Sequence, residues 1–146
     1  MDKLNQYEVW FITGSQHLYG NEILNNVQVH AEEISKYFDG HAEIPVRVKF
    51  KSVVTTPEEI RTLLMEANNS KSCIGLVLWM HTFSPAKMWI NGLKALSKPF
   101  VHLHTQYNAE IPWSAIDMDF MNENQSAHGD REFGFITTRL RINVSP

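Results

Sequence analysis

The side chains best suited to chemistry lie in three short polar segments, each directly after an apolar run. They are residues 14–20 (GSQHLYG), 81–85 (HTFSP) and 104–108 (HTQYN), which supply histidine, glutamine and aromatic side chains. In an open α/β sheet, ligands bind in the crevice outside the carboxyl ends of the strands. The pattern therefore predicts one face of a small-molecule site. A complete active site is not predicted, because no obvious acidic cluster for proton transfer accompanies these segments.

The first polar segment favours a neutral, hydroxylated ligand over a phosphate. It lacks the Gly-x-Gly-x-x-Gly pattern of dinucleotide sites and the Gly-Lys-Ser/Thr of a P-loop. Gln16 and His17 can donate and accept hydrogen bonds at short range, while Leu18 and Tyr19 would form an apolar wall. Phe83 lies in the second segment, where it could pack against a ligand or a partner.

Histidines also suggest a metal site, because the chain has seven of them. His102 and His104 are two residues apart on a predicted strand, so their side chains share one face of the sheet. His81 ends the neighbouring strand, and neutral imidazole is a common ligand of transition metals. The chain contains no His-Glu-x-x-His motif and only one cysteine. We therefore expect no complete metal site, and the alternative is that these histidines hydrogen-bond to the backbone or to a ligand hydroxyl.

The acidic residues Asp117, Asp119 and Glu123 lie near a predicted loop. Paired carboxylates can transfer protons or bind a metal. Asp117 and Asp119 are two apart on a predicted helix, so they point away from each other. Acids in the first turn favour the helix dipole, which makes a structural role the expected one. His128, beside Gly129 in a predicted loop, is available to carry a proton or bind a hydroxyl group.

The apolar pattern predicts a parallel sheet with helices between the strands. Arg47, Lys49 and Lys51 alternate with apolar residues in the second strand, which predicts an edge position. The order β-α-β-α-β-α-β gives a three-layer, doubly wound α/β fold of four strands in the order 2-1-3-4, followed by C-terminal helices. Thr56-Pro57 and Ser84-Pro85 both predict a capped helix start. The expected strands are 7–13, 46–54, 73–80 and 99–104, and the expected helices include 21–38, one starting at 56–59, 113–124 and 127–142.

Length and charge restrict the class of protein. A chain of 146 residues favours a single domain. The net charge of −3 without a basic cluster argues against nucleic acid as a partner. No apolar run approaches the ~18 residues of a membrane span, and the amino terminus lacks a signal-peptide pattern. We therefore expect a cytoplasmic protein without a membrane partner, and we expect Cys73, in an apolar run, to be buried.

Four stretches resemble the amino-terminal domain of bacterial L-arabinose isomerases: residues 7–20, 79–92, 117–122 and 125–136. The resemblance extends from about residue 5 to about residue 136. It implies conversion of L-arabinose to L-ribulose in arabinose catabolism, and in many members also of D-galactose to D-tagatose. It further implies a divalent metal, usually Mn²⁺, and a homo-oligomer in which this domain lines the site of a neighbouring subunit. The implied fold is of the Rossmann or flavodoxin type.

The resemblance also implies roles for individual residues. The substrate-binding residues would be Gln16, Leu18, Phe83, Gln125 and His128, all in predicted loops or turns. Catalytic glutamates and metal-binding histidines lie beyond this domain in the family, so we expect no catalytic residue, metal ligand or bound cofactor here. We interpret residues 1–146 as one N-terminal α/β domain without the central and C-terminal catalytic domains.

The last residues depart from the family pattern. Residues 137–146 keep part of a helix and then diverge. We therefore expect a truncated copy that is inactive by itself. Two other interpretations stay open: a non-catalytic sugar-binding or assembly module that associates through exposed apolar residues such as Trp113 and Phe120, and a nonfunctional gene product.

Overall fold

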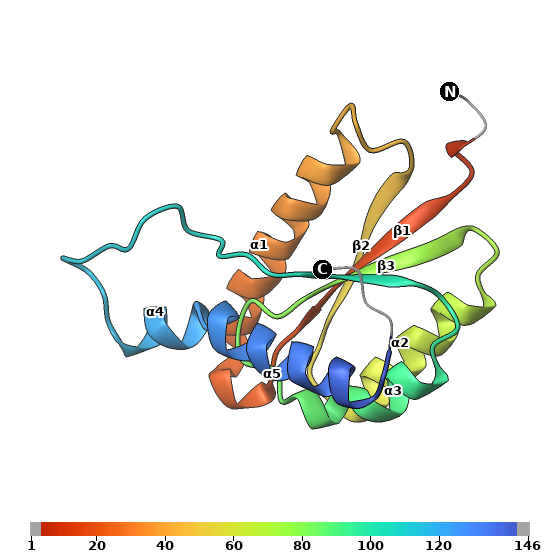
Figure 1. Ribbon diagram of the computed structural model, residues 1–146. Coiled ribbons are helices and arrows are strands. Elements are labelled where there is room, and N and C mark those ends of the chain that lie inside the picture. Colours follow the sequence, from red (N-terminus) through yellow and green to blue (C-terminus); the bar gives the residue numbers. More distant parts are fainter. Residues whose placement is uncertain (1–3, 143–146) are drawn as a thin grey trace.

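The computed structural model describes residues 4–142, which form an α/β fold around a four-stranded parallel sheet (Figure 1). The strands are β1 (Glu8–Gly14), β2 (Arg47–Val54), β3 (Cys73–Trp79) and β4 (Phe100–Leu103). Their order in the sheet is β2-β1-β3-β4, and every neighbouring pair is parallel. The fold class and strand order predicted from the sequence are therefore confirmed.

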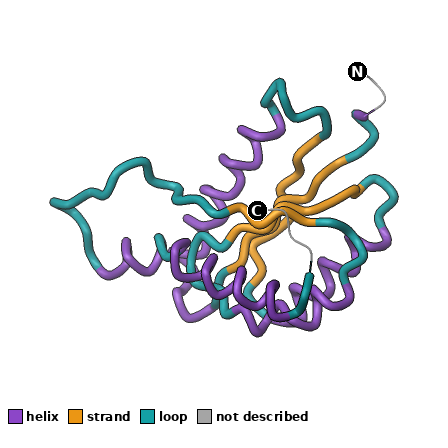
Figure 2. The backbone as a smooth tube through the Cα atoms, viewed as in Figure 1, coloured by secondary structure: helices purple, strands orange, loops and turns teal. Residues whose placement is uncertain are grey.

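Helices cover both faces of the sheet and produce three layers (Figures 1 and 2). Helix α1 lies on one face, while α2, α3 and α5 lie on the other. A parallel sheet requires such cover, because its strands connect through helices. The helices are α1 (Gly20–Asp39), α2 (Pro57–Asn69), α3 (Ile90–Ala95), α4 (Met118–Glu123) and α5 (Ser126–Arg139). Among residues 4–142, no helix is both long enough and apolar enough to cross a membrane.

The two faces of the sheet bury different cores. Ile12 and Leu78 point toward α2, α3 and α5, where Trp89 and Phe133 complete the larger core. A smaller core lies under α1 and consists of Phe11, Ala31, Val48 and Trp79. Cys73 is fully buried, as predicted from its apolar run. The alternation of side chains along β1 therefore places successive apolar residues in different cores.

The edge position of β2 follows from its own residues. Arg47 and Lys49 are exposed while Val48 is buried, so one side of this strand faces solvent. The capped start of α2 is also confirmed, because the Thr56 hydroxyl accepts a hydrogen bond from the Glu59 amide at 3.2 Å. The Glu59 carboxylate turns to the Thr55 amide, at 2.8 Å, and thus satisfies a second free N–H group.

The predicted cap at Ser84 is wrong. The Ser84 hydroxyl accepts a hydrogen bond from the buried Trp89 indole N–H at 3.0 Å, and a 3₁₀ turn (Ala86–Trp89) precedes α3 without a side-chain cap. Leaving the buried indole N–H without a partner would cost more free energy than leaving the start of this turn without a side-chain cap. Satisfying Trp89 therefore decides the position of the Ser84 side chain.

The predicted helix over residues 113–124 is mostly wrong. Residues 104–117 form an extended arm that leads away from the sheet, and only α4, starting at Met118, is helical (Figure 1). Trp113 is 79% exposed, so a helix here would have no surface on which to bury its apolar side. The Asp117 carboxylate accepts from the Phe120 amide at 2.8 Å and sets the start of α4, which agrees with the structural role expected for these acids.

The final helix is close to its prediction. Helix α5 runs from Ser126 to Arg139, within three residues of the predicted 127–142 at each end. Of the divergent segment at residues 137–146, positions 143–146 lie outside the described residues, as do positions 1–3 of the amino terminus.

Two glycines of α5 differ in the space around them, and the difference shows how tightly this helix packs on the segment after β3. A Cβ atom at Gly129 would lie 2.9 Å from the Thr82 backbone oxygen and 3.1 Å from Met80 Cβ, whereas a Cβ at Gly134 would meet nothing closer than 4.0 Å. We expect Gly129→Ala to lower the free energy of unfolding by about 1–3 kcal/mol, because a backbone oxygen cannot move aside. Gly134→Ala, the matched control, should stabilise the same helix by about 0.5–1 kcal/mol. Urea denaturation of both variants measures this, and equal effects would contradict the close packing at Gly129.

Candidate functional site

The segment after β3 is buried and held by hydrogen bonds from two directions. His81, Thr82 and Ser84 are completely inaccessible to solvent. The Ser15 and Thr82 hydroxyl groups are 2.7 Å apart, which joins the segments after β1 and β3. The Ser126 hydroxyl donates to the His81 carbonyl at 3.1 Å and fixes the start of α5 against the same segment. Three parts of the chain that are distant in sequence therefore meet at the carboxyl ends of β1 and β3.

Phe83 and His128 are brought together at this position. Phe83 is the partly exposed residue of an otherwise buried stretch, and its ring centroid lies 4.7 Å from that of His128. His128 lies in the first turn of α5 rather than in the predicted loop, but it is exposed, so its imidazole is accessible to a ligand. The close approach of Gly129 to Thr82 makes this arrangement possible, because it seats α5 directly on the segment that carries Phe83.

Gln125 lies beside His128 and lines the same hollow. The hollow has a volume of about 510 Å³ and lies between the arm, α4 and the start of α5. Its polar lining consists of the amides of Gln106, Asn108, Asn124 and Gln125, the carboxyl of Glu110 and the imidazole of His128, and its apolar lining includes Ile111, Ile116 and Phe120. A side-chain amide offers both donors and acceptors, which suits a neutral ligand with several hydroxyl groups.

Gln16 and Leu18 lie in the segment after β1, which the Ser15–Thr82 contact joins to the segment that carries Phe83. They lie between β1 and α1, next to and within a 3₁₀ turn (His17–Tyr19), and neither lines the hollow that contains Gln125 and His128. The Leu18 side chain is 84% exposed. His17, the alternative ligand-binding residue of this segment, hydrogen-bonds to Thr55 at 2.8 Å. That partner gives the His17 imidazole a structural role in connecting the segments after β1 and β2.

A cluster of His30, His81, Tyr107 and Glu123 was missed by the sequence reasoning. His30 Nδ1 is 2.8 Å from His81 Nε2 and 3.5 Å from a Glu123 carboxylate oxygen. The Tyr107 ring stacks on the His30 ring with centroids 3.7 Å apart. A signal for this cluster exists in the sequence: His30 lies three residues after Val27 and four before Ile34, on the inner face of α1.

Burial keeps the two histidines of this cluster neutral. Burial, with a smaller contribution from the nearby His30, lowers the pKa of His81 to about 3. The pKa of His30 is also lowered, by burial, although the charges of Glu123 and Glu33 oppose this shift. Neutral imidazoles each have one nitrogen with a free lone pair, so both rings can accept a hydrogen bond or bind a metal ion.

A buried carboxylate forms a second polar centre that the sequence did not indicate. Asp130 is almost completely buried, and its Oδ1 lies 2.6 Å from His102 Nε2. Burial raises the pKa of the Asp130 carboxyl, while the hydrogen bond to His102 opposes this shift. The predicted common face of His102 and His104 is confirmed, since their rings are nearly parallel with centroids 6.1 Å apart. The neighbouring His81 does not join them, because it packs toward α1.

The described residues do not fit the Mn²⁺ that the resemblance implies. Within residues 4–142, His30, His81 and Glu123 form the group whose ligand atoms all lie within 4.8 Å of one another. This group offers two nitrogens and one carboxylate, whereas Mn²⁺ favours oxygen-rich sites and is the weakest binder of its series. No step of the isomerase chemistry is therefore assigned to it.

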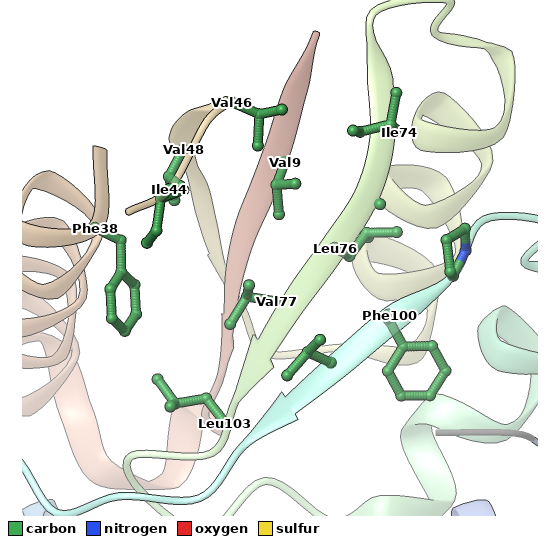
Figure 3. Close-up of a pocket in the computed structure, with 13 residues that line it drawn as sticks. Val9, Phe38, Ile44, Val46, Val48, Ile74, Leu76, Val77, Phe100 and Leu103 are labelled. Atoms are coloured by element: carbon green, nitrogen blue, oxygen red, sulfur yellow. The ribbon is translucent and has the colours of Figure 1, made fainter. Parts of the chain in front are cut away.

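A second large hollow lies on the sheet face beside α1 and is lined by residues of all four strands (Figure 3). Its volume is about 430 Å³, and Phe38, Val48, Val77 and Leu103 are among the residues that line it. Every lining side chain is apolar, so the hollow has nothing with which to bind hydroxyl groups. This hollow is therefore not the candidate sugar site.

The fold and the polar segments define a doubly wound α/β domain with a candidate ligand site at the carboxyl ends of its strands. Comparison with known proteins shows the family: a family model described as the L-arabinose isomerase N-terminal domain matches residues 3–145, and the chain belongs to this family. The chain is 67% identical over 139 residues to an L-arabinose isomerase of Herpetosiphon aurantiacus, and 64% identical over 143 residues to one of Koribacter versatilis.

These matches cover nearly all of this chain but a small part of each relative. They include 95% and 98% of the chain, but only 28% and 29% of the two relatives. An L-arabinose isomerase of Flavobacterium johnsoniae, 61% identical over 141 residues, gives the same proportions, with 97% of the chain and 28% of the relative covered. The chain thus spans less than a third of the length of these proteins.

The buried neutral His81 predicts a loss of stability in mild acid. Because its folded pKa of about 3 lies below the ordinary value of 6.5, the unfolded state takes up the proton first as the pH falls. Stability is therefore complete above the unfolded pKa and decreases toward the folded one. We expect the free energy of unfolding in EDTA-containing buffer to fall by about 2 kcal/mol from pH 7 to pH 5 through this residue.

Urea denaturation at the two pH values measures this loss. His81→Gln, whose side chain cannot take up a proton, should be less stable at pH 7 but should lose less stability on acidification. An equal loss in both proteins would show that His81 is not held neutral.

Proposed function

We propose that this chain performs the part of the N-terminal domain in an L-arabinose isomerase. In this proposal it recognises the hydroxyl groups of L-arabinose and L-ribulose at a site completed by a neighbouring subunit. The observation that supports it most directly is the grouping of Phe83, Gln125 and His128 at the carboxyl ends of the strands, beside a hollow with amide and apolar lining.

The proposed roles follow from the chemistry of each side chain. Gln16, Gln125 and His128 bind sugar hydroxyls, because amides and imidazole both donate and accept hydrogen bonds. Leu18 and Phe83 form the apolar wall against the carbon side of the sugar. Small-molecule sites usually combine apolar side chains, which bury part of the ligand, with a few polar groups that hydrogen-bond to the rest.

Proton transfer and metal binding are assigned to the rest of the full-length protein. Aldose–ketose isomerisation moves a proton between C1 and C2 of the sugar, which requires a positioned acid and base. The Mn²⁺ that the resemblance implies would supply Lewis-acid polarisation of the sugar oxygens when bound. Since the described residues offer no donor set that fits this ion, we propose that the chain alone does not turn over sugar.

Exposed apolar side chains support a neighbouring subunit as the partner of this domain. Leu18 is 84% exposed beside the polar residue Gln16, and apolar surface of this kind is typical of a contact with another molecule. The same surface would then carry residues that complete the neighbour's site. We further propose a cytoplasmic location, which fits a single, buried cysteine without a disulfide partner.

A second candidate function is a non-catalytic assembly module, which the exposed arm favours. Trp113 is 79% exposed, and Ile111, Ile116, Met118 and Met121 are exposed around it. Phe120, the other residue expected on this surface, is partly buried and lines the hollow instead. A concentration of large apolar side chains on an arm favours subunit assembly, with or without sugar turnover.

Sugar recognition is tested in a chimera in which residues 4–142 replace the matching region of the Herpetosiphon aurantiacus enzyme. We expect the chimera to isomerise L-arabinose, and Gln16→Ala and His128→Ala each to raise KM about 5–10-fold, because each removes hydrogen bonds worth about 1 kcal/mol. Gln28→Ala is the control, since Gln28 lies exposed on α1 and bonds only to Glu32 among the described residues. Unchanged kinetics in both site variants would refute the assigned roles.

Assembly is tested separately, by sedimentation of this chain over a range of concentrations. We expect self-association that Trp113→Ala weakens about 30-fold, because buried tryptophans at interfaces commonly contribute about 2 kcal/mol or more. Phe135→Ala is the control, because Phe135 is exposed on α5, away from the arm. A monomer at all concentrations, or equal weakening by both substitutions, would contradict assembly through the arm.

A further inference from the structure

The cluster of His30, His81 and Glu123 joins three segments that are far apart in sequence. His30 comes from the middle of α1, His81 from the buried segment after β3, and Glu123 from the last turn of α4. Their nearest ligand atoms are 2.8 Å apart for the two histidines and 3.5 Å apart for His30 and Glu123. Three side chains of metal-binding type thus converge on one point.

These separations match those around a bound ion. With metal–nitrogen and metal–oxygen bonds of about 2.0–2.2 Å, neighbouring ligand atoms lie about 3.0–3.5 Å apart in octahedral or tetrahedral geometry. The two measured separations lie near this range, and the one ligand atom that each residue offers lies within 4.8 Å of the other two. Small shifts of these side chains would therefore admit an ion.

Hydrogen bonding alone leaves the cluster in conflict. If His30 Nδ1 is unprotonated, its lone pair faces the Glu123 carboxylate. If it is protonated and donates to His81 Nε2, neutral His81 must carry its proton on Nδ1, which is buried without a hydrogen-bond partner among the described residues. The backbone carbonyl of His81 lies near its own ring and raises the pKa of the imidazole. It does not, however, form a hydrogen bond of normal geometry with His81 Nδ1. A cation would turn the opposed lone pair and carboxylate into ligands.

Neighbouring side chains already orient the ligands. Asn26 donates to Glu123 Oε2 at 3.1 Å, which leaves Oε1 directed at His30. Tyr107 stacks on the His30 ring, and Trp79 stacks on the His81 ring with centroids 4.5 Å apart and an interplanar angle of 8°. Outer partners that fix ligand orientation are a regular feature of metal sites.

We propose that His30, His81 and Glu123 bind one divalent transition-metal ion of the zinc type, which fastens α4 to α1 and to the segment after β3. Helix α4 has no buried residue, so packing contributes little to its position. An ion held by its last turn and by two residues of the main body would supply that restraint. Two imidazoles and one carboxylate favour Zn²⁺ or Co²⁺ over Mn²⁺.

The test is titration of the EDTA-treated, desalted chain with Zn²⁺, followed by calorimetry and by the visible absorption of the Co²⁺ form. We expect one equivalent of Zn²⁺ to bind, with Mn²⁺ at least about tenfold weaker. His30→Gln and Glu123→Gln should each weaken Zn²⁺ binding at least about tenfold, and Asn26→Ala, which removes an outer partner, should weaken it about tenfold. Zn²⁺ should also slow amide hydrogen exchange in residues 118–123.

Matched controls separate this site from surface histidines. His41→Gln and Glu66→Gln make the same chemical changes outside the cluster and should leave Zn²⁺ affinity and stoichiometry unchanged. Circular dichroism in EDTA shows whether each variant folds. If His30→Gln fails to fold, the nearly isosteric Glu123→Gln still tests the proposal. Failure to bind Zn²⁺, equal binding by the cluster variants and the controls, or tighter binding of Mn²⁺ would each overturn the proposal.

Discussion

The need to satisfy the buried polar groups after β3 constrains the rest of this structure. A buried backbone or hydroxyl group without a partner costs more than a typical hydrogen bond contributes, so each group in this segment requires a partner. Ser15 provides one from the β1 side, and Ser126 provides another from the start of α5. These bonds determine where α5 begins, and α5 in turn places His128 beside Phe83. The candidate ligand site is thus a consequence of how the carboxyl ends of two central strands are closed.

The same burial separates the histidines into different chemical roles. His81 is inaccessible and has a strongly lowered pKa, so it contributes lone pairs rather than charge near neutral pH. His128 is exposed, and its ring remains available to a ligand. His102 faces the buried Asp130, whose carboxyl has a raised pKa because of burial. Position relative to the two cores, rather than residue type, therefore decides which histidine can bind sugar, metal or carboxylate.

The sheet was predictable from the sequence because its determinants are local. Alternation in β2 and continuous apolar residues in β3 directly reflect exposure on one face or on none. The clusters around His30 and Asp130 were not predictable, since they depend on contacts between residues 28 to 93 positions apart. The helix predicted at residue 113 failed for a related reason: apolar periodicity signals a helix only where a surface exists to receive it. Of the five predicted site residues, the structure brings Phe83 and His128 into contact and places Gln125 and His128 at one hollow. Gln16 and Leu18 lie in the segment after β1, which the Ser15–Thr82 contact joins to the segment of Phe83.

The exposure of Leu18 and His128 argues for a ligand site shared between molecules. Small-molecule sites bury most of the ligand surface, and side chains as exposed as Leu18 and His128 do not enclose a sugar by themselves. Enclosure requires further surface, and the apolar groups exposed at Leu18 and Trp113 are suited to bring that surface into contact. The apolar hollow lined by all four strands adds a third region of this kind (Figure 3). The physical features of this domain therefore favour recognition of substrate as part of a larger assembly over recognition by the domain alone.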